Sequence, residues 1–172
     1  MVQQLQIRYY HYQSQATYRV KNVNLQQFEQ GISMNIVIID GQGGQLGAQL
    51  VKEILTQFPQ ENLTAIGTNA AATAAMMKAG ARNAATGENP VTVACRKADV
   101  IIGPIGIVIA DSLLGEVTEQ MARSIGRADA TRILIPMNKC ENLVAGVPNL
   151  STAALIADTV AKLRNIIDRQ TS

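Results

Sequence analysis

The segment from residue 35 to residue 58 constrains the fold of this chain more than any other part of its sequence. Asn35–Asp40 is apolar at every interior position, which is typical of a strand buried on both faces of a parallel sheet. A glycine-rich loop follows, and Leu46–Phe58 then repeats apolar residues at helical spacing. A strand, a glycine loop and an amphipathic helix in this order predict the opening unit of an α/β domain.

The same alternation of strand and helix patterns continues along the chain. Further strands are expected at Leu63–Gly67, Asn83–Ala85, Asp99–Gly103 and Arg132–Pro136, with Asn142–Val147 as a short edge strand. Further helices are expected at Ala70–Ala79, at Ile107–Ile125, and from an N-cap at Ser151 to Asp168. The predicted fold class is therefore a single Rossmann-like α/β domain. It is a doubly wound, mainly parallel sheet of about five strands with helices on both faces.

Residues 1–33 differ in composition from residues 34–172. They contain all four tyrosines, the single histidine (His11), and three basic residues against one acidic residue. The formal net charge of +2 therefore belongs to this segment, and residues 34–172 are neutral overall. Because a strand pattern begins directly after Met34, we expect the α/β domain to span residues 34–172 and Met34 to be the natural start. Residues 1–33 would then be a disordered extension or a translated leader, with a functional arm as the alternative.

The composition of the domain excludes several classes of function. A neutral domain with Phe58 as its one aromatic residue offers neither the basic face nor the stacking rings that nucleic acids require. The longest apolar run, Val100–Ala110, is far shorter than the roughly 20 residues of a membrane-spanning helix, so we expect a cytoplasmic protein without membrane contact. Residues 34–172 contain no histidine. This excludes Ser-His-Asp and Cys-His nucleophile pairs and histidine-ligated zinc, and no metal site is predicted.

The loop after the first strand carries most of the functional signal. Its glycines at positions 41, 43 and 47 follow the Gly-x-Gly-x-x-x-Gly variant of the dinucleotide-binding loop. We expect Gly41 to form a tight turn with a positive φ and Gly47 to let the helix lie against the strand. Gly43 and Gly44 would allow a pyrophosphate to approach the backbone, where unpaired N–H groups favour an anion. The predicted ligand-binding residues here are Asp40, Gly41, Gln42, Gly43, Gly44 and Gly47. A turn that needs glycine for its geometry alone is the alternative.

Two departures from the dinucleotide pattern bear on the ligand. The second strand ends in Thr68 and Asn69 rather than in the acid that binds the ribose of NAD. A hydroxyl and an amide suit a phosphate better, such as the 2′-phosphate of NADP, but no arginine accompanies them, and they could equally cap the next helix. Asp40 beside a phosphate site would need Mg²⁺, a sugar hydroxyl, or hydrogen bonds from the loop backbone. The cofactor stays undetermined, with NADP or another nucleotide, and Mg²⁺, as candidates.

Further polar loops are expected at the same edge of the sheet, because ligands of open parallel sheets bind beyond the carboxyl ends of the strands. Lys139 is a candidate partner for a phosphate or carboxylate, with a surface lysine as the alternative. Glu88 is the candidate acid or base, and Asp111 and Lys139 are further catalytic candidates. The predicted ligand-binding residues in these loops are Thr86, Gly87, Glu88, Asn89, Gly103, Pro104, Gly106, Asn138 and Lys139.

Five segments form a recognisable set: Met34–Gly47, Gly67–Asn69, Ala85–Pro90, Gly103–Ser112 and Pro136–Cys140. Together they resemble an uncharacterised family of short bacterial Rossmann-like proteins catalogued as a domain of unknown function. The resemblance covers about residues 34–160. It implies the domain boundary at Met34 and this set of loops, and it implies no reaction.

The expected function is binding of a phosphate-bearing small molecule, a nucleotide or an NADP-like compound, at the glycine loop. Whether the protein is an enzyme stays open. The alternatives are a non-catalytic ligand-sensing or partner-binding module, and a structural protein with an empty glycine turn. The helix expected after Gly106 is more apolar than one face of a sheet requires, which suggests a homodimer, with burial inside the monomer as the alternative.

Overall fold

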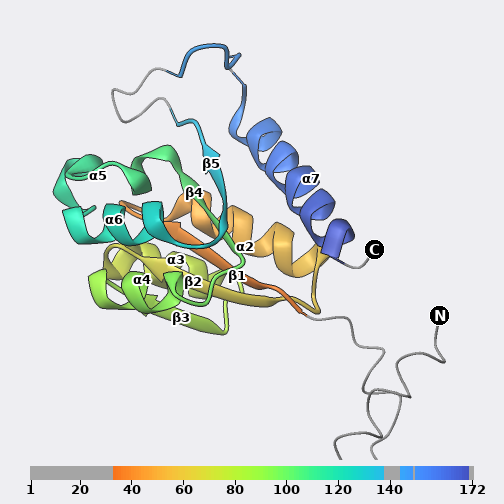
Figure 1. Cartoon of the computed structure of the whole chain (residues 1–172), viewed down its shortest axis with the longest axis horizontal. Coiled ribbons are helices and arrows are strands. Elements are labelled where there is room, and N and C mark those ends of the chain that lie inside the picture. The colour runs from red at the N-terminus through yellow and green to blue at the C-terminus, as the bar shows by residue number, and fades with distance from the viewer. Residues whose placement is uncertain (1–32, 138–143, 149, 171–172) are drawn as a thin grey trace, which may run out of the picture. The chain divides into compact units, whose positions relative to one another are not determined.

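Five parallel strands form one sheet in the order β3-β2-β1-β4-β5 (Figure 1). The computed structural model describes residues 33–137, 144–148 and 150–170. The strands are β1 (Asn35–Asp40), β2 (Asn62–Gly67), β3 (Asn83–Thr86), β4 (Val100–Pro104) and β5 (Thr131–Ile135). The helices are α2 (Gln45–Gln57), α3 (Ala70–Lys78), α4 (Glu88–Cys95), α5 (Ser112–Gly115), α6 (Glu119–Arg127), α7 (Thr152–Gln170) and the short 3-10 helix η2 (Ile105–Val108).

β1 lies at the centre of the sheet and pairs in parallel with β2 on one side and β4 on the other. Ile38, for example, lies beside Ala65 of β2 and Ile102 of β4. The chain builds outward from β1 to β3, then crosses back to form β4 and β5. This reversal creates a switch point between the carboxyl ends of β1 and β4, which is where open α/β sheets bind their ligands.

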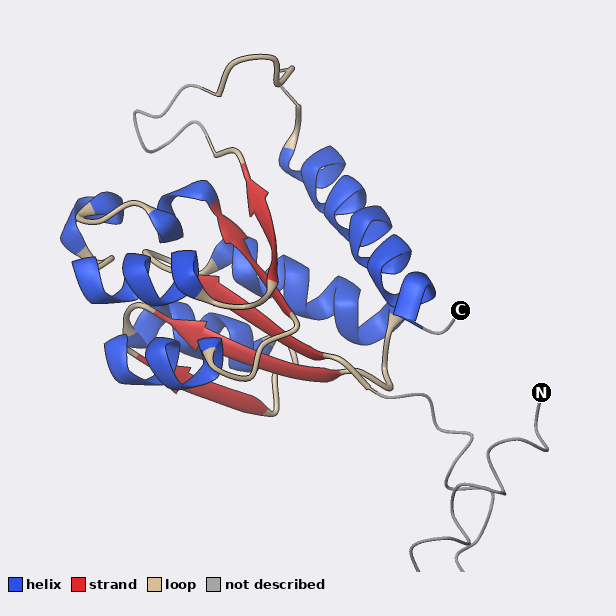
Figure 2. Ribbon diagram, in the orientation of Figure 1, coloured by secondary structure: helices blue, strands red, loops and turns tan. Residues whose placement is uncertain are grey.

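Alternate side chains of the strands supply two hydrophobic cores, because successive residues of a strand point to opposite faces. Ile36 and Ile38 belong to the core covered by α2, α3 and α7, whereas Val37 and Ile39 belong to the core covered by α4 and α6. Figure 2 shows the sheet between these two helical layers. None of the four side chains is more than 3% exposed. β1 is therefore buried on both faces, as its apolar sequence predicts.

The structure confirms the predicted fold class and most of the predicted elements. β1 begins and ends at the expected residues, and β2, β4 and β5 differ from the expected ranges by one residue at one or both ends. Ser151 is the expected N-cap of α7, since its hydroxyl oxygen accepts a hydrogen bond from the N–H of Ala154 at 3.2 Å.

The single helix expected at Ile107–Ile125 is wrong. The chain forms η2, α5 and α6 there instead. A continuous helix is interrupted because Asp111, before α5, and Leu113 and Leu114, within it, adopt positive φ angles of 63°, 56° and 62°. The spacing of apolar residues cannot reveal residues with a positive φ, because these residues stand within the stretch whose spacing predicts a helix.

Most of the apolar side chains that suggested a homodimer are buried within the monomer. Ile107, Leu113, Val117 and Met121 are no more than 8% exposed and pack in the core on the α4 and α6 side of the sheet. Leu114 differs from them, because it is 95% exposed. The sequence pattern therefore reflects core packing, and a homodimer loses the observation that suggested it.

Two further expectations are corrected by the structure. The loop expected at residues 86–90 is a helix from Glu88 on, where α4 (Glu88–Cys95) begins. Pro90 lies in its first turn, where a proline needs no helical hydrogen bond. Residues 144–147 form a turn rather than an edge strand, with the N–H of Val147 donating to the carbonyl of Val144 at 3.4 Å. The first two residues of that expected strand, 142 and 143, lie outside the described residues.

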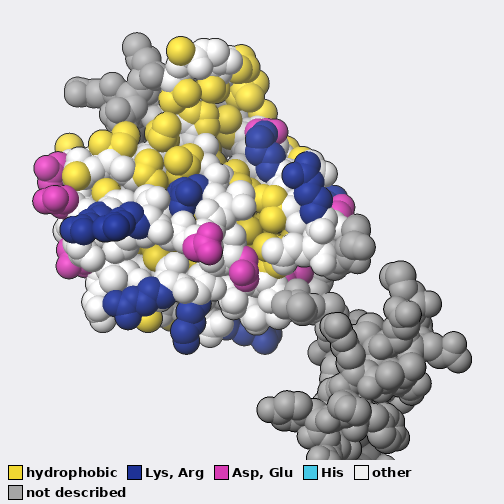
Figure 3. All heavy atoms as spheres, viewed as in Figure 1, with side chains coloured by type: hydrophobic (Ala, Val, Ile, Leu, Met, Phe, Trp, Pro, Cys, Tyr) yellow, Lys and Arg dark blue, Asp and Glu magenta, His cyan; other side chains and the backbone are white. Residues whose placement is uncertain are grey.

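Exposed hydrophobic side chains gather at one end of the surface in Figure 3, at the top of the view where residues 144–148 lie. Val144, Val147 and Leu150 are each more than one third exposed. No helix in the described part of the chain has the length and apolar character needed to cross a membrane.

Candidate functional site

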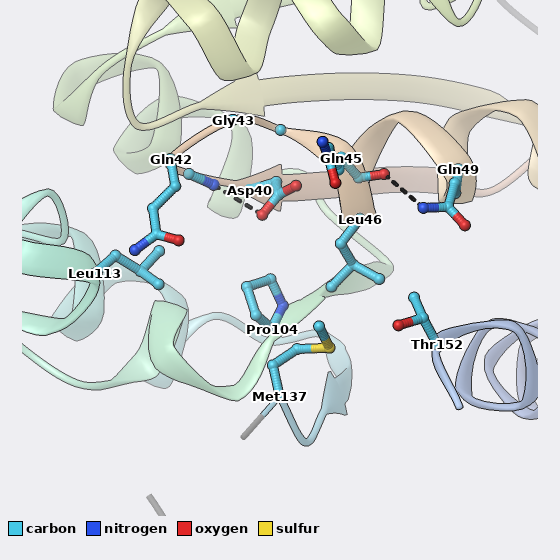
Figure 4. A pocket seen from close by; sticks show the side chains of 12 residues that line it. Asp40, Gln42, Gly43, Gln45, Leu46, Gln49, Pro104, Leu113, Met137 and Thr152 are labelled. Carbon is cyan, nitrogen blue, oxygen red and sulfur yellow. Dashed lines mark hydrogen bonds between the residues drawn. The ribbon is translucent and has the colours of Figure 1, made fainter. Parts of the chain in front are cut away.

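A pocket of about 360 Å³ opens at the carboxyl ends of β1 and β4, at the switch point of the sheet. Figure 4 shows the glycine loop on one side of it, Pro104 and Met137 on the opposite side, and Thr152 reaching it from α7. Its lining residues are Asp40, Gly41, Gln42, Gly43, Gly44, Gln45, Leu46, Gln49, Pro104, Leu113, Met137 and Thr152. This set from the described residues contains no lysine or arginine. Among the described residues, the backbone N–H groups of the loop are therefore the main source of positive potential in this pocket.

The glycine loop is a tight turn that leads directly into α2. The N–H of Gly44 donates to the carbonyl of Gly41 at 2.9 Å. Gln42 has a φ of 50° and Gly44 a φ of 66°. The left-handed residues are thus Gln42 and Gly44, and the expected positive φ at Gly41 is wrong. Gly41 has a different requirement, because a Cβ there would lie 2.6 Å from the hydroxyl oxygen of Thr68.

Close packing of α2 requires two of the other glycines. A Cβ on Gly44 would lie 2.5 Å from the Cα of Ala72 in α3. A Cβ on Gly47 would lie 2.6 Å from the sulfur of Met76 and 2.8 Å from the Cβ of Asp40. Gly47 therefore lets the helix lie against the strand, as the sequence predicts.

Gly43 has neither of these requirements. A Cβ at this position would have no atom within 4 Å, and the φ of Gly43 lies outside the left-handed region. The residue is exposed and lines the pocket. The described part of the chain thus gives no packing or conformational reason for glycine at position 43.

Asp40 ends β1 and is 6% exposed. Its Oδ1 accepts a hydrogen bond from the N–H of Gly41 at 2.8 Å, and its Oδ2 accepts one from the N–H of Gly47 at 2.6 Å. Burial raises the pKa of Asp40, the two backbone hydrogen bonds lower it, and the nearby Glu116 carboxylate adds to the rise, with a net raised pKa. Of the three environments considered for Asp40, the structure therefore shows hydrogen bonds from the loop backbone. Asp40 satisfies an N–H of the first turn of α2, as an N-cap side chain does.

Asp40→Asn should remove part of the pH dependence of the domain's stability. Like the protonated acid, the amide carries no charge, and it does not titrate. Because the folded pKa of Asp40 is raised, its contribution to stability is fully present below the unfolded pKa of about 3.9 and declines as pH rises through the folded pKa. Urea denaturation of both proteins between about pH 4 and pH 8 measures this slope. Identical slopes in the two proteins would contradict it.

Three backbone N–H groups at the start of α2 remain free to bind a ligand. The N–H groups of Gly43, Gln45 and Leu46 have no acceptor among the described residues, whereas those of Gly47 and Ala48 are bonded within the protein. All three free groups belong to residues that line the pocket. Together with the positive end of the α2 dipole, they favour an anion.

Glu116 is the site residue that the sequence patterns did not identify. Its Oε2 accepts hydrogen bonds from the N–H of Gln42 at 2.8 Å, the hydroxyl of Thr68 at 2.5 Å and the side-chain amide of Asn69 at 2.8 Å. Partial burial raises the pKa of Glu116, but the hydrogen bonds from Thr68, Gln42 and Asn69 together bring it below its ordinary value. Glu116 is therefore an ionised carboxylate that is bonded to the glycine loop.

The segment before Glu116 has an unusual backbone that presents this carboxylate to the loop. The left-handed conformation recurs at Asp111, Leu113, Leu114 and Gly115, and the N–H of Asp111 donates to the carbonyl of Val117 at 2.8 Å. The hydrogen-bond partners of Glu116 are 47, 48 and 74 residues away in the sequence. No local motif could have indicated the contact, because it depends on the tertiary fold.

The side chains of Thr68 and Asn69 do not offer free donors to a 2′-phosphate in this structure. Their donor groups bond to Glu116, and the amide of Asn69 also donates to the carbonyl of Gln42 at 3.0 Å. The side-chain oxygen of Asn69 accepts from the N–H of Ala72 at 2.8 Å and caps α3. The alternative that Asn69 caps the next helix is thus confirmed.

Of the three predicted residues on the β4 side, one lines the pocket. Pro104 is buried and lines it. Gly103 precedes it in β4, where a Cβ would lie 2.3 Å from the carbonyl oxygen of Ile39. Gly106 lies in η2 and its carbonyl accepts a hydrogen bond from the hydroxyl of Ser112. Gly103 thus allows close packing of β4 against β1, and the Gly106 carbonyl is already an acceptor within the protein.

The remaining predicted residues that the structure describes are not brought into the pocket. The lining of the pocket lacks the predicted residues at the end of β3 and the start of α4, which are Thr86, Gly87, Glu88 and Asn89. Glu88 instead accepts a hydrogen bond from the hydroxyl of Thr118 at 2.6 Å. Asp111 is exposed. Asn138 and Lys139 lie outside the described residues, so their roles stay predictions.

Residues 35–168 match the family model described as a domain of unknown function, DUF3842. No curated protein and no solved structure matches the chain. The matched range begins at the first residue of β1 and ends within α7, so it contains every residue that lines the pocket, and Glu116 as well.

Proposed function

The chain belongs to the family DUF3842, and we propose that it binds a phosphate-bearing small molecule of the nucleotide class in the pocket beside the glycine loop. The phosphate accepts hydrogen bonds from the free N–H groups at the start of α2. The apolar side chains opposite the loop contact the remainder of the ligand. These roles follow from the place of each group around one pocket at the switch point of the sheet.

The observation that carries this proposal is the environment of Gly43. The glycines at positions 41, 44 and 47 are each required by atoms of the protein that a Cβ would meet. Gly43 meets no such atom and has no positive φ, yet it lies on the pocket beside unpaired N–H groups. A ligand that approaches the backbone closely supplies the requirement that the protein itself lacks.

The size and lining of the pocket are consistent with such a ligand. Its volume of about 360 Å³ lies in the range of small-molecule sites, about 300–1,000 Å³. Leu46, Pro104, Leu113 and Met137 provide apolar contacts, as ligand pockets commonly do beside a few polar groups. Both oxygens of Asp40 already accept backbone N–H groups of the loop and α2, so neither has to bind the ligand directly.

Thermal unfolding of the full chain with candidate ligands tests the proposal. The probes are inorganic pyrophosphate, ADP, NAD⁺ and NADP⁺, each with and without Mg²⁺. A ligand that binds the native state alone stabilises it by about 2.7 kcal/mol at roughly 100 times its Kd, which raises Tm by several degrees. A rise in Tm with at least one phosphate-bearing probe, and none with adenosine alone, is expected. The absence of a shift with every probe would favour a structural protein whose glycine turn binds nothing.

A further inference from the structure

The carboxylate of Glu116 lies at the end of β2, where the sequence lacks the acid that binds ribose in NAD-binding proteins. The side chain comes from the segment between α5 and α6, and not from β2 itself. We infer that Glu116 selects the ligand by its ribose: its carboxylate accepts hydrogen bonds from free ribose hydroxyls and excludes a ligand phosphorylated at the 2′ position. This inference rests on the proposed function and names the ligand class as nucleotides with unmodified ribose.

The structure holds this carboxylate in a defined position. Three donors converge on Oε2: the N–H of Gln42, the hydroxyl of Thr68 and the side-chain amide of Asn69. A Cβ on Gly41 would lie 2.8 Å from the same oxygen. The glycine at position 41 therefore lets the carboxylate reach the loop, which gives this residue of the motif a role that backbone conformation does not explain.

The second oxygen, Oε1, makes no hydrogen bond to any described residue. Three bonds to Oε2 orient the side chain and leave the lone pairs of Oε1 as acceptors. A carboxylate oxygen in this state suits hydroxyl donors, because charge-assisted O–H to O⁻ hydrogen bonds are short and strong. The vicinal 2′- and 3′-hydroxyls of ribose are such donors.

A 2′-phosphate would meet the opposite chemistry at this position. It would face the negative charge of Glu116, with Asp40 as a second acid nearby. The side-chain donors of Thr68 and Asn69 are already bonded to Glu116 and to Gln42, and no described arginine or lysine bonds to the glycine loop or lines the pocket. Like charges in contact without a cation discriminate strongly between ligands.

Glu116 does not itself line the pocket, but it is bonded to a residue that does. Gln42 lines the pocket and donates its N–H to Glu116, and Gly41 lines it as well. Leu113, three residues before Glu116, is a further lining residue. One nucleotide can therefore place its phosphate at the start of α2 and its ribose at Glu116.

Isothermal titration of the full chain with NAD⁺, NADP⁺ and pyrophosphate tests the inference. The wild-type protein should bind NAD⁺ at least about tenfold more tightly than NADP⁺, the value of one charge-assisted hydrogen bond. Glu116→Gln should reduce this ratio to near unity and change the affinity for pyrophosphate little. Glu119→Gln removes an exposed acid three residues away and should keep the wild-type ratio. Its net charge equals that of the test variant.

Several results would overturn the inference. A wild-type preference for NADP⁺ would show, without any variant, that Glu116 does not select an unmodified ribose. An unchanged ratio of the two affinities in Glu116→Gln would show the same. A large gain in pyrophosphate affinity in Glu116→Gln would show that the carboxylate competes with the phosphate for the loop. Binding of pyrophosphate without discrimination between the dinucleotides refutes the ribose inference alone. Failure of the wild-type protein to bind any of the three refutes the proposed function as well.

Discussion

Gly44→Ala should lower the unfolding free energy of the domain by about 2–5 kcal/mol, the largest loss expected from a single methyl group in this loop. Two costs combine at this position. The φ of 66° is unfavourable for any residue with a Cβ. The new Cβ would also lie 2.5 Å from the Cα and 2.8 Å from the carbonyl oxygen of Ala72. Because these are backbone atoms of α3, the clash is relieved only by moving one helix away from the other.

Gly43→Ala is the matched control, one residue earlier in the same turn. Its Cβ would meet no atom within 4 Å and its φ is not left-handed. The unfolding free energy of this variant should therefore stay within about 0.5 kcal/mol of the wild type, or rise slightly because alanine lowers the conformational entropy of the unfolded chain. Urea denaturation of the two variants in parallel measures both values. Equal losses in the two variants would show that the turn tolerates no side chain at all and that the contact geometry described for Gly43 does not govern stability.

Gly43→Val should weaken binding of a phosphate-bearing ligand by about a hundredfold or more while the protein stays folded. The side chain would project into open space from a loop residue that lines the pocket, in the same turn as the free N–H groups of Gly43, Gln45 and Leu46. A phosphate oxygen must come within about 3 Å of those nitrogens to accept their hydrogen bonds, and the added methyl groups would keep it away. Titration with whichever probe raises the Tm of the wild-type protein gives the affinity ratio.

Gln49→Ala provides the control for this experiment. Gln49 also lines the pocket, and its side-chain amide donates to the carbonyl of Gln45 at 3.2 Å on an exposed face of α2. Its truncation changes the pocket without approaching the N–H groups, so affinity should fall by less than about threefold. Binding by Gly43→Val that matches the wild type would place the phosphate elsewhere and would remove the main support for the proposed function.

The elements around the first strand were predictable because their signals are local. β1, the glycine loop and α2 follow one another within a short stretch, and each has its own pattern of hydrophobic spacing or glycine content. The segment after Gly106 was not predictable in the same way. Its apolar residues do enter the core, but the left-handed residues Asp111, Leu113 and Leu114 break the helix that their spacing indicates. α4 was missed because its first residues, from Glu88 to Pro90, are also typical of loops.

The residues of the candidate site were likewise predictable only where their signals are local in the sequence. Asp40 and the glycines were identified from the motif, and the structure assigns a packing or conformational reason to Gly41, Gly44 and Gly47 but none to Gly43. The motif could not show which groups satisfy the loop donors. Asp40 accepts from its own loop and helix, whereas the donors at Gln42, Thr68 and Asn69 bond to Glu116 from a distant part of the chain.

The sequence by itself determined that this chain builds a parallel sheet around a strand buried on both faces and that a glycine turn joins this strand to α2. Those features depend on the volume and polarity of residues that are neighbours along the chain. Only the tertiary structure decided that the α2 terminus keeps free N–H groups on a pocket and that a carboxylate stands at the end of β2. Both depend on parallel strands carrying loops from distant parts of the chain to one edge of the sheet, where hydrogen bonds form between groups that no sequence spacing relates.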